Sequence, residues 1–258
     1  MQNMQVNIDQ LQILGQNPYV FFAGVGIVFS FLCFNLLLKR YGHDINKNNI
    51  NYFISFAGLF IGAKLFGIFT NLIVAWNQGN VITMSTFLSS GIVFYGGLIG
   101  YLLFFIFVNK KQNKSVDYHV IDVVVVCIPL FHAFGRVGCF FSGCCYGREM
   151  DTPISIMYIT ARLEPSMRVP VQLLEATASL TIFVVCLTLL INRKLSGKVL
   201  SLYLLLYASV RFILEFLRGD IERGFIGILS FSQVISILVF GFLVIQIKMC
   251  KQREVIQI

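Results

Sequence analysis

The sequence contains few charged residues. Of its 258 residues, 12% are Asp, Glu, Lys or Arg and 57% are hydrophobic, and the mean hydropathy is +0.80. A soluble globular domain carries roughly 25% charged residues. This chain therefore lacks the polar surface needed to face water on all sides. The shortage excludes a soluble globular protein and indicates that lipid is its main solvent.

Several other features are missing. No apolar segment alternates as a barrel strand does, no linker or low-complexity tract separates a second domain, and no internal repeat supports a transporter built from repeated halves. The first 17 residues contain no Lys or Arg, whereas a cleavable signal peptide begins with a basic region. We therefore expect a single transmembrane domain over residues 1–258, with its first apolar segment retained as a helix.

Seven apolar segments are long enough to cross a bilayer core of about 30 Å, which takes about 20 residues. They are predicted near residues 18–38, 50–75, 91–108, 120–141, 171–191, 199–217 and 227–247. The predicted fold class is an all-α integral membrane protein of about seven transmembrane helices. A longer polar connection predicts a small, partly irregular external cap over about residues 142–170.

Basic residues alternate between the connections. They occur in the first, third and fifth connections and in the C-terminal tail, but not in residues 76–90. Short loops rich in Lys and Arg stay in the cytoplasm, so the N-terminus is predicted outside and the C-terminus inside. The net charge of +8 follows this pattern, and no basic face for nucleic acid is seen. Five external arginines break the pattern, and either lipid headgroups or a solvated loop surface would explain them: Arg148, Arg162, Arg168, Arg218 and Arg223.

Polar and ionisable residues interrupt the apolar segments, where a charge costs about 2.5–3.5 kcal/mol near the bilayer centre. The predicted topology places most of them in the outer half of the membrane. Arg211, Glu215 and Arg218 share one helix face, whereas Arg136 has no acidic neighbour in sequence. These arginines predict a phosphate pocket, since the planar guanidinium makes paired hydrogen bonds to phosphate oxygens. The alternative is a buried Arg–Glu pair that fixes helix register.

The stretch from 132 to 148 is rich in glycine and cysteine. Its glycines indicate a tight backbone around a ligand. Its His and Cys residues have the spacing H-x6-C-x4-C-C, which matches no common zinc pattern, and no metal is expected. Adjacent Cys144 and Cys145 cannot easily form a disulfide. Elsewhere, Gly58 and Gly62 have the spacing of a close helix contact.

Six ordered blocks resemble the prolipoprotein diacylglyceryl transferases, bacterial enzymes that move diacylglycerol from phosphatidylglycerol to a lipoprotein cysteine. The longest block runs from Gly135 to Arg148, and the others cover residues 62–65, 96–100, 170–175, 211–218 and 229–236. The chain departs from the family at several polar positions. Tyr95 replaces a histidine, Lys64 an arginine, Cys139 and Ser142 two asparagines, and Cys144 an acidic residue.

The resemblance implies a transferase of the bacterial plasma membrane. Its substrates would be phosphatidylglycerol and prolipoprotein signal peptides, with no cofactor and no obligate protein partner. Arg136 and Arg211 would hold the lipid phosphate, and Tyr95 paired with an arginine would be the base, with His132 in reserve. The expected catalytic residues are Tyr95, Arg136, Arg211 and Glu215. The expected substrate-binding residues are Arg136, Lys64, Gly96, Gly97, Gly138, Cys139, Gly147, Gln172, Glu175, Arg218 and Gln233.

The departures leave two other functions open. A non-catalytic or altered-specificity paralogue would keep the headgroup pocket without the same chemistry. A channel or carrier for a small anion would use the same arginines, although the absent repeat and the odd number of helices count against it.

Overall fold

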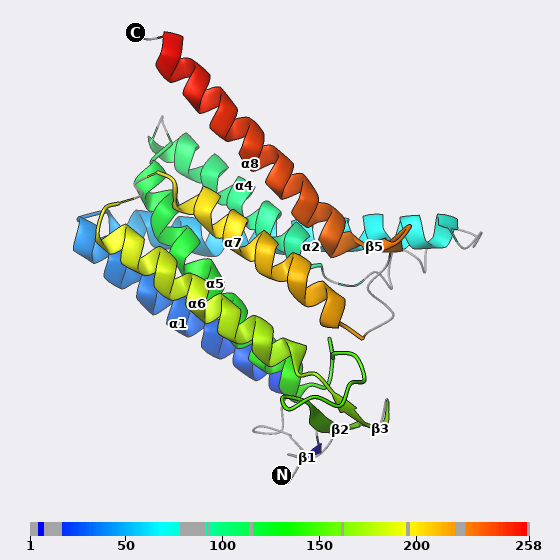
Figure 1. Cartoon of the computed structure of the whole chain (residues 1–258). Helices are drawn as coiled ribbons and strands as arrows, with labels where there is room; N and C mark the ends of the chain where they lie inside the picture. The colour runs from blue at the N-terminus through cyan, green and yellow to red at the C-terminus, as the bar shows by residue number, and fades with distance from the viewer. Residues whose placement is uncertain are drawn as a thin grey trace.

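The computed structural model describes residues 5–7, 17–77, 91, 93–113, 116–160, 163–194, 197–219 and 225–256. Within these ranges there are seven α-helices, one at each predicted apolar segment (Figure 1). They are α1 Pro18–Tyr41, α2 Ile45–Asn77, α4 Phe94–Asn113, α5 Tyr118–Phe141, α6 Val171–Ile191, α7 Val199–Leu214 and α8 Phe231–Ile256. The predicted all-α membrane fold is confirmed.

Two helix starts differ from the prediction by more than three residues. Helix α8 begins at Phe231 rather than at 227, because Gly227 has a left-handed φ of 61° and turns the chain between strands β4 (Phe225–Ile226) and β5 (Leu229–Ser230). Helix α2 begins at Ile45 rather than at 50, since its first turns are polar and hydropathy alone does not detect them. Both differences lie at an end of an apolar segment, where hydropathy is least informative.

Helix α5 is the centre of the bundle. It packs against both α1 and α6 (Figure 1), and 67% of its most apolar window is buried, compared with 22% for α1 and α2. Among the described residues, α1, α2, α5, α6 and the segment formed by α7 and the 3₁₀ turn η1 (Glu215–Leu217) are long and apolar enough to cross a membrane. Most residues in that window of α5 are therefore surrounded by protein rather than by lipid.

Helices α2 and α4 approach each other at their glycines. A Cβ atom on Gly58 would lie 2.5 Å from the carbonyl oxygen of Gly100, and one on Gly62 would overlap the carbonyl oxygen of Gly96. Small residues permit this direct backbone contact between membrane helices. The packing interpretation of Gly58 and Gly62 is confirmed.

A small sheet lies beyond the end of α5 that bears the glycine-rich stretch. Strands β2 (Ile156–Thr160) and β3 (Leu163–Arg168) are antiparallel, and β1 (Gln5–Asn7) pairs with β2 in parallel. Backbone hydrogen bonds fasten the cap to the end of α7, from Arg148 N–H to Leu217 C=O at 2.9 Å and from Gly219 N–H to Tyr146 C=O at 3.0 Å.

Two of the five expected external arginines are buried in protein. Arg168 forms an ion pair with Glu149, and its guanidinium lies 4.8 Å from the centre of the Tyr146 ring. Arg218 is also buried. Neither side chain is part of a solvated loop surface. Arg162 and Arg223 lie outside the described residues.

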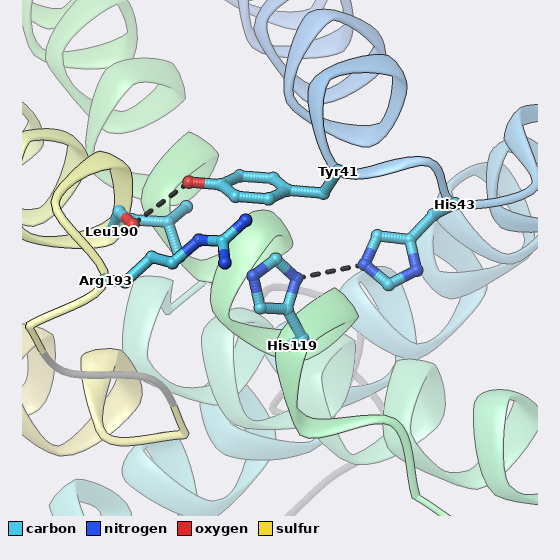
Figure 2. Close-up of a pocket in the computed structure, with 5 residues that line it drawn as sticks. All are labelled: Tyr41, His43, His119, Leu190 and Arg193. Atoms are coloured by element: carbon cyan, nitrogen blue, oxygen red, sulfur yellow. Dashed lines mark hydrogen bonds between the residues drawn. The ribbon is translucent and has the colours of Figure 1, made fainter.

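A cavity of about 320 Å³ lies at the opposite end of the bundle, where α1 and α6 end and α5 begins. Figure 2 shows the side chains that line it. The Tyr41 hydroxyl donates to the Leu190 carbonyl at 3.0 Å, and Nε2 of His43 lies 2.9 Å from Nδ1 of His119. These bonds tie the ends of three helices together, and they lie at the opposite end of α5 from the glycine-rich stretch.

Candidate functional site

A second and larger cavity, of about 720 Å³, lies beside the cap. Helices α2, α4, α5, α7 and α8 all contribute to its wall, as does the loop that follows α5. Cavities of about 300–1,000 Å³ are typical of small-molecule sites. Its ionisable and polar lining residues include Tyr95, His132, Arg136, Cys139, Cys144, Cys145, Arg211, Arg218 and Ser232.

A buried carboxylate links two of the arginines. Glu175 is 1% exposed; its Oε1 lies 2.9 Å from Nη2 of Arg136, and its Oε2 lies 3.4 Å from Nη1 of Arg211. Arg211 also pairs with Glu215, with Nη2 and Oε2 separated by 2.9 Å. Arg136 has no acidic neighbour in sequence, and its acidic partner comes from α6 rather than from its own helix.

The four chain segments that meet here do so at their ends. Arg136 lies near the end of α5, Glu175 near the start of α6, and Arg211 near the end of α7. Helix α8 contributes Ser232, whose hydroxyl accepts a hydrogen bond from Nη2 of Arg211 at 3.1 Å. The expected Arg211–Glu215 pair therefore exists, and it belongs to a network that spans four segments.

His132 is held between neighbours on three sides. Its Nε2 lies 3.2 Å from Nε of Arg136, its Nδ1 lies 3.2 Å from the Ser179 hydroxyl, and its ring stacks on Phe94 with the centroids 4.0 Å apart. Arginine only donates, so Nε2 is the acceptor and the neutral ring carries its hydrogen on Nδ1. His132 thus makes an interhelical hydrogen bond and also lines the cavity.

Tyr95 lines the cavity but, among the residues that the structure describes, is not bonded to an arginine. Its hydroxyl lies 3.0 Å from the hydroxyl of Ser236 on α8, and Ser236 in turn donates to the carbonyl of Ser232 at 2.8 Å. The expected pairing of Tyr95 with an arginine is therefore replaced by a hydrogen bond between neutral groups. A phenol with an ordinary pKa near 10 is mostly protonated at neutral pH.

Several expected binding residues shape the walls instead of lining the cavity. Gln172 donates to the Cys144 carbonyl at 2.7 Å and to the Tyr158 hydroxyl at 2.8 Å, which fixes the loop after α5. Burial raises the pKa of Tyr158, so this hydroxyl stays protonated. Gln233 accepts from the Ser230 N–H at 3.0 Å at the start of α8.

The expected glycines also have packing roles. Gly96 and Gly97 face α2, a Cβ on Gly138 would lie 3.1 Å from the Cα of Tyr19, and one on Gly147 would overlap the Val169 carbonyl oxygen. Lys64 is half-buried on α2 and is not among the residues that line the cavity.

Ser179 and Ser232 are polar partners that sequence reasoning did not single out, and Ser236 entered it only as the last residue of the 229–236 block. Ser232 and Ser236 are four residues apart on α8, the spacing that places two side chains on one helix face. This spacing is the sequence signal from which the Ser232–Ser236 pair could have been predicted. Nothing in the sequence pairs Ser179 with His132.

Together, the fold and the site define an integral membrane protein with a cationic cavity beside a small cap. The chain belongs to the prolipoprotein diacylglyceryl transferase family, whose profile matches residues 7–248. It is 32% identical over 259 aligned positions to phosphatidylglycerol–prolipoprotein diacylglyceryl transferase 2 of Clostridium perfringens, covering 97% of this chain and 98% of the relative. It is 31% identical to the corresponding transferase of Clostridium tetani, covering 92% and 94%. A third relative, from Campylobacter hominis, is 31% identical and covers 74% and 72%.

Proposed function

We propose that this chain transfers a diacylglyceryl group from phosphatidylglycerol to the cysteine thiol of prolipoprotein signal peptides and releases glycerol phosphate. The observation that carries the proposal is the charge of the larger cavity. Three guanidiniums, from Arg136, Arg211 and Arg218, line it, and two carboxylates, Glu175 and Glu215, pair with them. With neutral His132, one positive charge is left over. A phosphodiester carries the single negative charge that would balance it.

Arg136 has N–H donors left for a phosphate. A guanidinium has five N–H donors. The bonds of Arg136 to described residues use Nε, toward His132, and Nη2, toward Glu175. Its Nη1 donors are left for a ligand. Glu175 fixes the orientation of the guanidinium groups of Arg136 and Arg211, so both groups are in position before the lipid binds.

The reaction follows from this arrangement. A thiolate attacks the glyceryl carbon next to the phosphate, a C–S bond forms, and the C–O bond breaks with its electron pair going to glycerol phosphate. Preorganised donors stabilise the charge that develops on this leaving group. The acceptor thiol, with an ordinary pKa near 8.5, must lose its proton. Tyr95 lies in the cavity wall and serves either as the base or as a hydrogen-bond donor to the lipid.

We further propose that the protein lies in the bacterial plasma membrane with its N-terminus outside and its C-terminus in the cytoplasm. The charge pattern of the connections supports this orientation. The described N-terminal strand lies at the cap end of the bundle, and the C-terminal end of α8 lies at the other end (Figure 1). In this orientation the cavity opens in the outer half of the membrane, where signal peptides emerge.

Complementation tests the proposal. In cells depleted of their own transferase, the wild-type gene should restore lipoprotein maturation. Arg136→Ala should abolish it, and Arg136→Lys should recover little, because a lysine ammonium lacks the paired donors. Loss of one such donor group typically lowers the rate by about 10²–10³-fold.

Arg40→Ala is the matched control, since Arg40 is exposed at the opposite end of α1. Normal maturation with Arg136→Lys would contradict the bidentate phosphate role. Failure of the wild-type gene, with the protein present in the membrane, would contradict the transferase function itself.

A further inference from the structure

Three cysteine thiols gather in the wall of the larger cavity. The Sγ atoms of Cys139, Cys144 and Cys145 all lie within 4.8 Å of one another, and all three residues line the cavity together with Arg136. Cys139 is 8% exposed, and the other two are half-buried. The proposed transfer uses the thiol of the acceptor, so it gives these three thiols no role.

The end of helix α5 brings the first two cysteines together. Gly143 has a left-handed φ of 66°; its N–H donates to the Phe140 carbonyl at 3.2 Å, and the Cys144 N–H donates to the Cys139 carbonyl at 3.2 Å. This pair of bonds is the Schellman motif, in which the second residue beyond the helix folds back onto its last turn. Cys144 is thereby placed over Cys139.

The third cysteine is held in an unfavourable backbone conformation. Cys145 has a φ of +58°, which costs an L-residue other than glycine about 1–2 kcal/mol. Strain of this kind persists where the surrounding structure fixes it, and it clusters at functional sites. The hydrogen bond from Gln172 to the Cys144 carbonyl, at 2.7 Å, holds the loop in place from α6.

The separation of the sulfurs suits a metal ion. Metal–thiolate bonds of about 2.3 Å in a tetrahedral site place the sulfurs roughly 3.8 Å apart. The sulfurs therefore need to approach one another by about 1 Å or less to occupy three corners of the metal's tetrahedron. Thiolates favour Zn²⁺ and Cu⁺.

We propose that Cys139, Cys144 and Cys145 form a three-thiolate site for a soft metal ion such as Zn²⁺. Its fourth position faces the cavity and takes the thiol of the acceptor. The proposed catalytic role, but not the metal site itself, rests on the proposed function. Three protein ligands with one open position is the arrangement of catalytic zinc sites.

The metal gives a route to the thiolate that needs no side-chain base. On coordination the acceptor thiol loses its proton to solvent, because a metal-bound thiol is deprotonated. Its sulfur then attacks the glyceryl carbon, the C–S bond forms, and the C–O electron pair leaves with glycerol phosphate. The product is a neutral thioether, a weaker ligand that dissociates from the metal. No oxidant or reductant is needed.

Metal binding is tested first, without lipid or acceptor. The purified full chain, reduced and freed of metal, is titrated in detergent with Co²⁺ and then with Zn²⁺. We expect one Co²⁺ per chain with thiolate-to-cobalt charge-transfer absorption, displaced by Zn²⁺. Cys139→Ser, Cys144→Ser and Cys145→Ser should each weaken binding by at least about 100-fold. Cys33→Ser, on α1 away from the cavity, should bind normally.

Two results overturn the site: no stoichiometric Co²⁺ binding by the reduced wild-type chain, or equal binding by the cluster variants. Transfer to a lipobox peptide is then measured on the metal-free and the zinc-loaded protein. Loss of transfer without metal and its return with Zn²⁺ support the catalytic role. Equal transfer by the two forms overturns that role and leaves the transferase function standing. Absence of transfer from both forms, with Co²⁺ still bound, overturns the proposed function and leaves the metal site standing.

Discussion

Glu175 is the residue whose removal should most damage the charge network. It is 1% exposed and is the carboxylate that joins Arg136 to Arg211. Loss of one partner from a buried ion pair costs about 3–5 kcal/mol, since a charge is left uncompensated. Glu175→Ala should therefore destabilise the protein by about this amount.

The two partners should not respond equally. Arg136→Ala leaves Glu175 paired with Arg211, so it should cost less than Glu175→Ala. The double variant removes one charge of each sign and keeps the pair of Arg211 with Glu215. It should be milder than the sum of the single variants by about 0.5–3 kcal/mol, the usual coupling between contacting residues.

Thermal unfolding in detergent measures these effects. For a chain of this size, 1 kcal/mol corresponds to roughly 2–4 °C, so Glu175→Ala should lower the midpoint by roughly 6–20 °C. Glu175→Gln keeps the volume and removes only the charge. It should resemble Glu175→Ala if the charge is what matters. A midpoint for Glu175→Gln within a degree of wild type, or strict additivity in the double variant, would refute the reasoning.

Three further predictions concern other parts of the molecule. If Tyr95 is the base, Tyr95→Phe should slow transfer by about 10²–10⁴-fold with lipid binding intact. If its hydroxyl only positions the lipid, binding should weaken while bound lipid still reacts, and full activity would exclude both roles. Gly100→Val should cost at least about 1–3 kcal/mol by overpacking the α2–α4 contact, whereas Gly241→Val, with no atom within 4 Å of its Cβ, should leave the unfolding midpoint unchanged. In a cysteine-free background, a cysteine at Gln112 should be labelled only from the cytoplasm and one at Asp151 only from outside, and labelling of both from the same side would contradict the topology.

The helices were predictable because each contains an apolar segment, and five of those described are long and apolar enough to cross a membrane. Contacts within one helix were predictable because residues four apart lie on one helix face. Arg211 and Glu215 are four residues apart, and they pair. Apart from the glycine contact between α2 and α4, contacts between helices were not predictable, because hydropathy does not give the rotation of one helix against another. The bond of Glu175 to Arg136 and that of Tyr95 to Ser236 both depend on that rotation.

The cysteine cluster shows a similar limit. The spacing of Cys139, Cys144 and Cys145 matches no common metal motif, and spacing alone predicted no site. The three sulfurs converge because Gly143 ends the helix with a left-handed turn and Cys145 adopts a second positive φ. A motif search compares sequence spacing, whereas a ligand set depends on where the backbone reverses.

The backbone hydrogen bonds that fasten the cap to the end of α7, here called the seam, have a mechanical consequence. The seam lies at Tyr146, Arg148, Leu217 and Gly219, around Gly147, where a Cβ would overlap a neighbouring carbonyl. Side-chain changes at Tyr146, Arg148 or Leu217 leave such bonds intact, whereas a Cβ on Gly147 or Gly219 would not fit, so the cap and the end of α7 behave as one stiff rim of the cavity. A lipid with two acyl chains needs a wide lateral opening. We expect that opening to form away from this rim, where α2 and α8 line the cavity, and we expect these two helices to move during turnover.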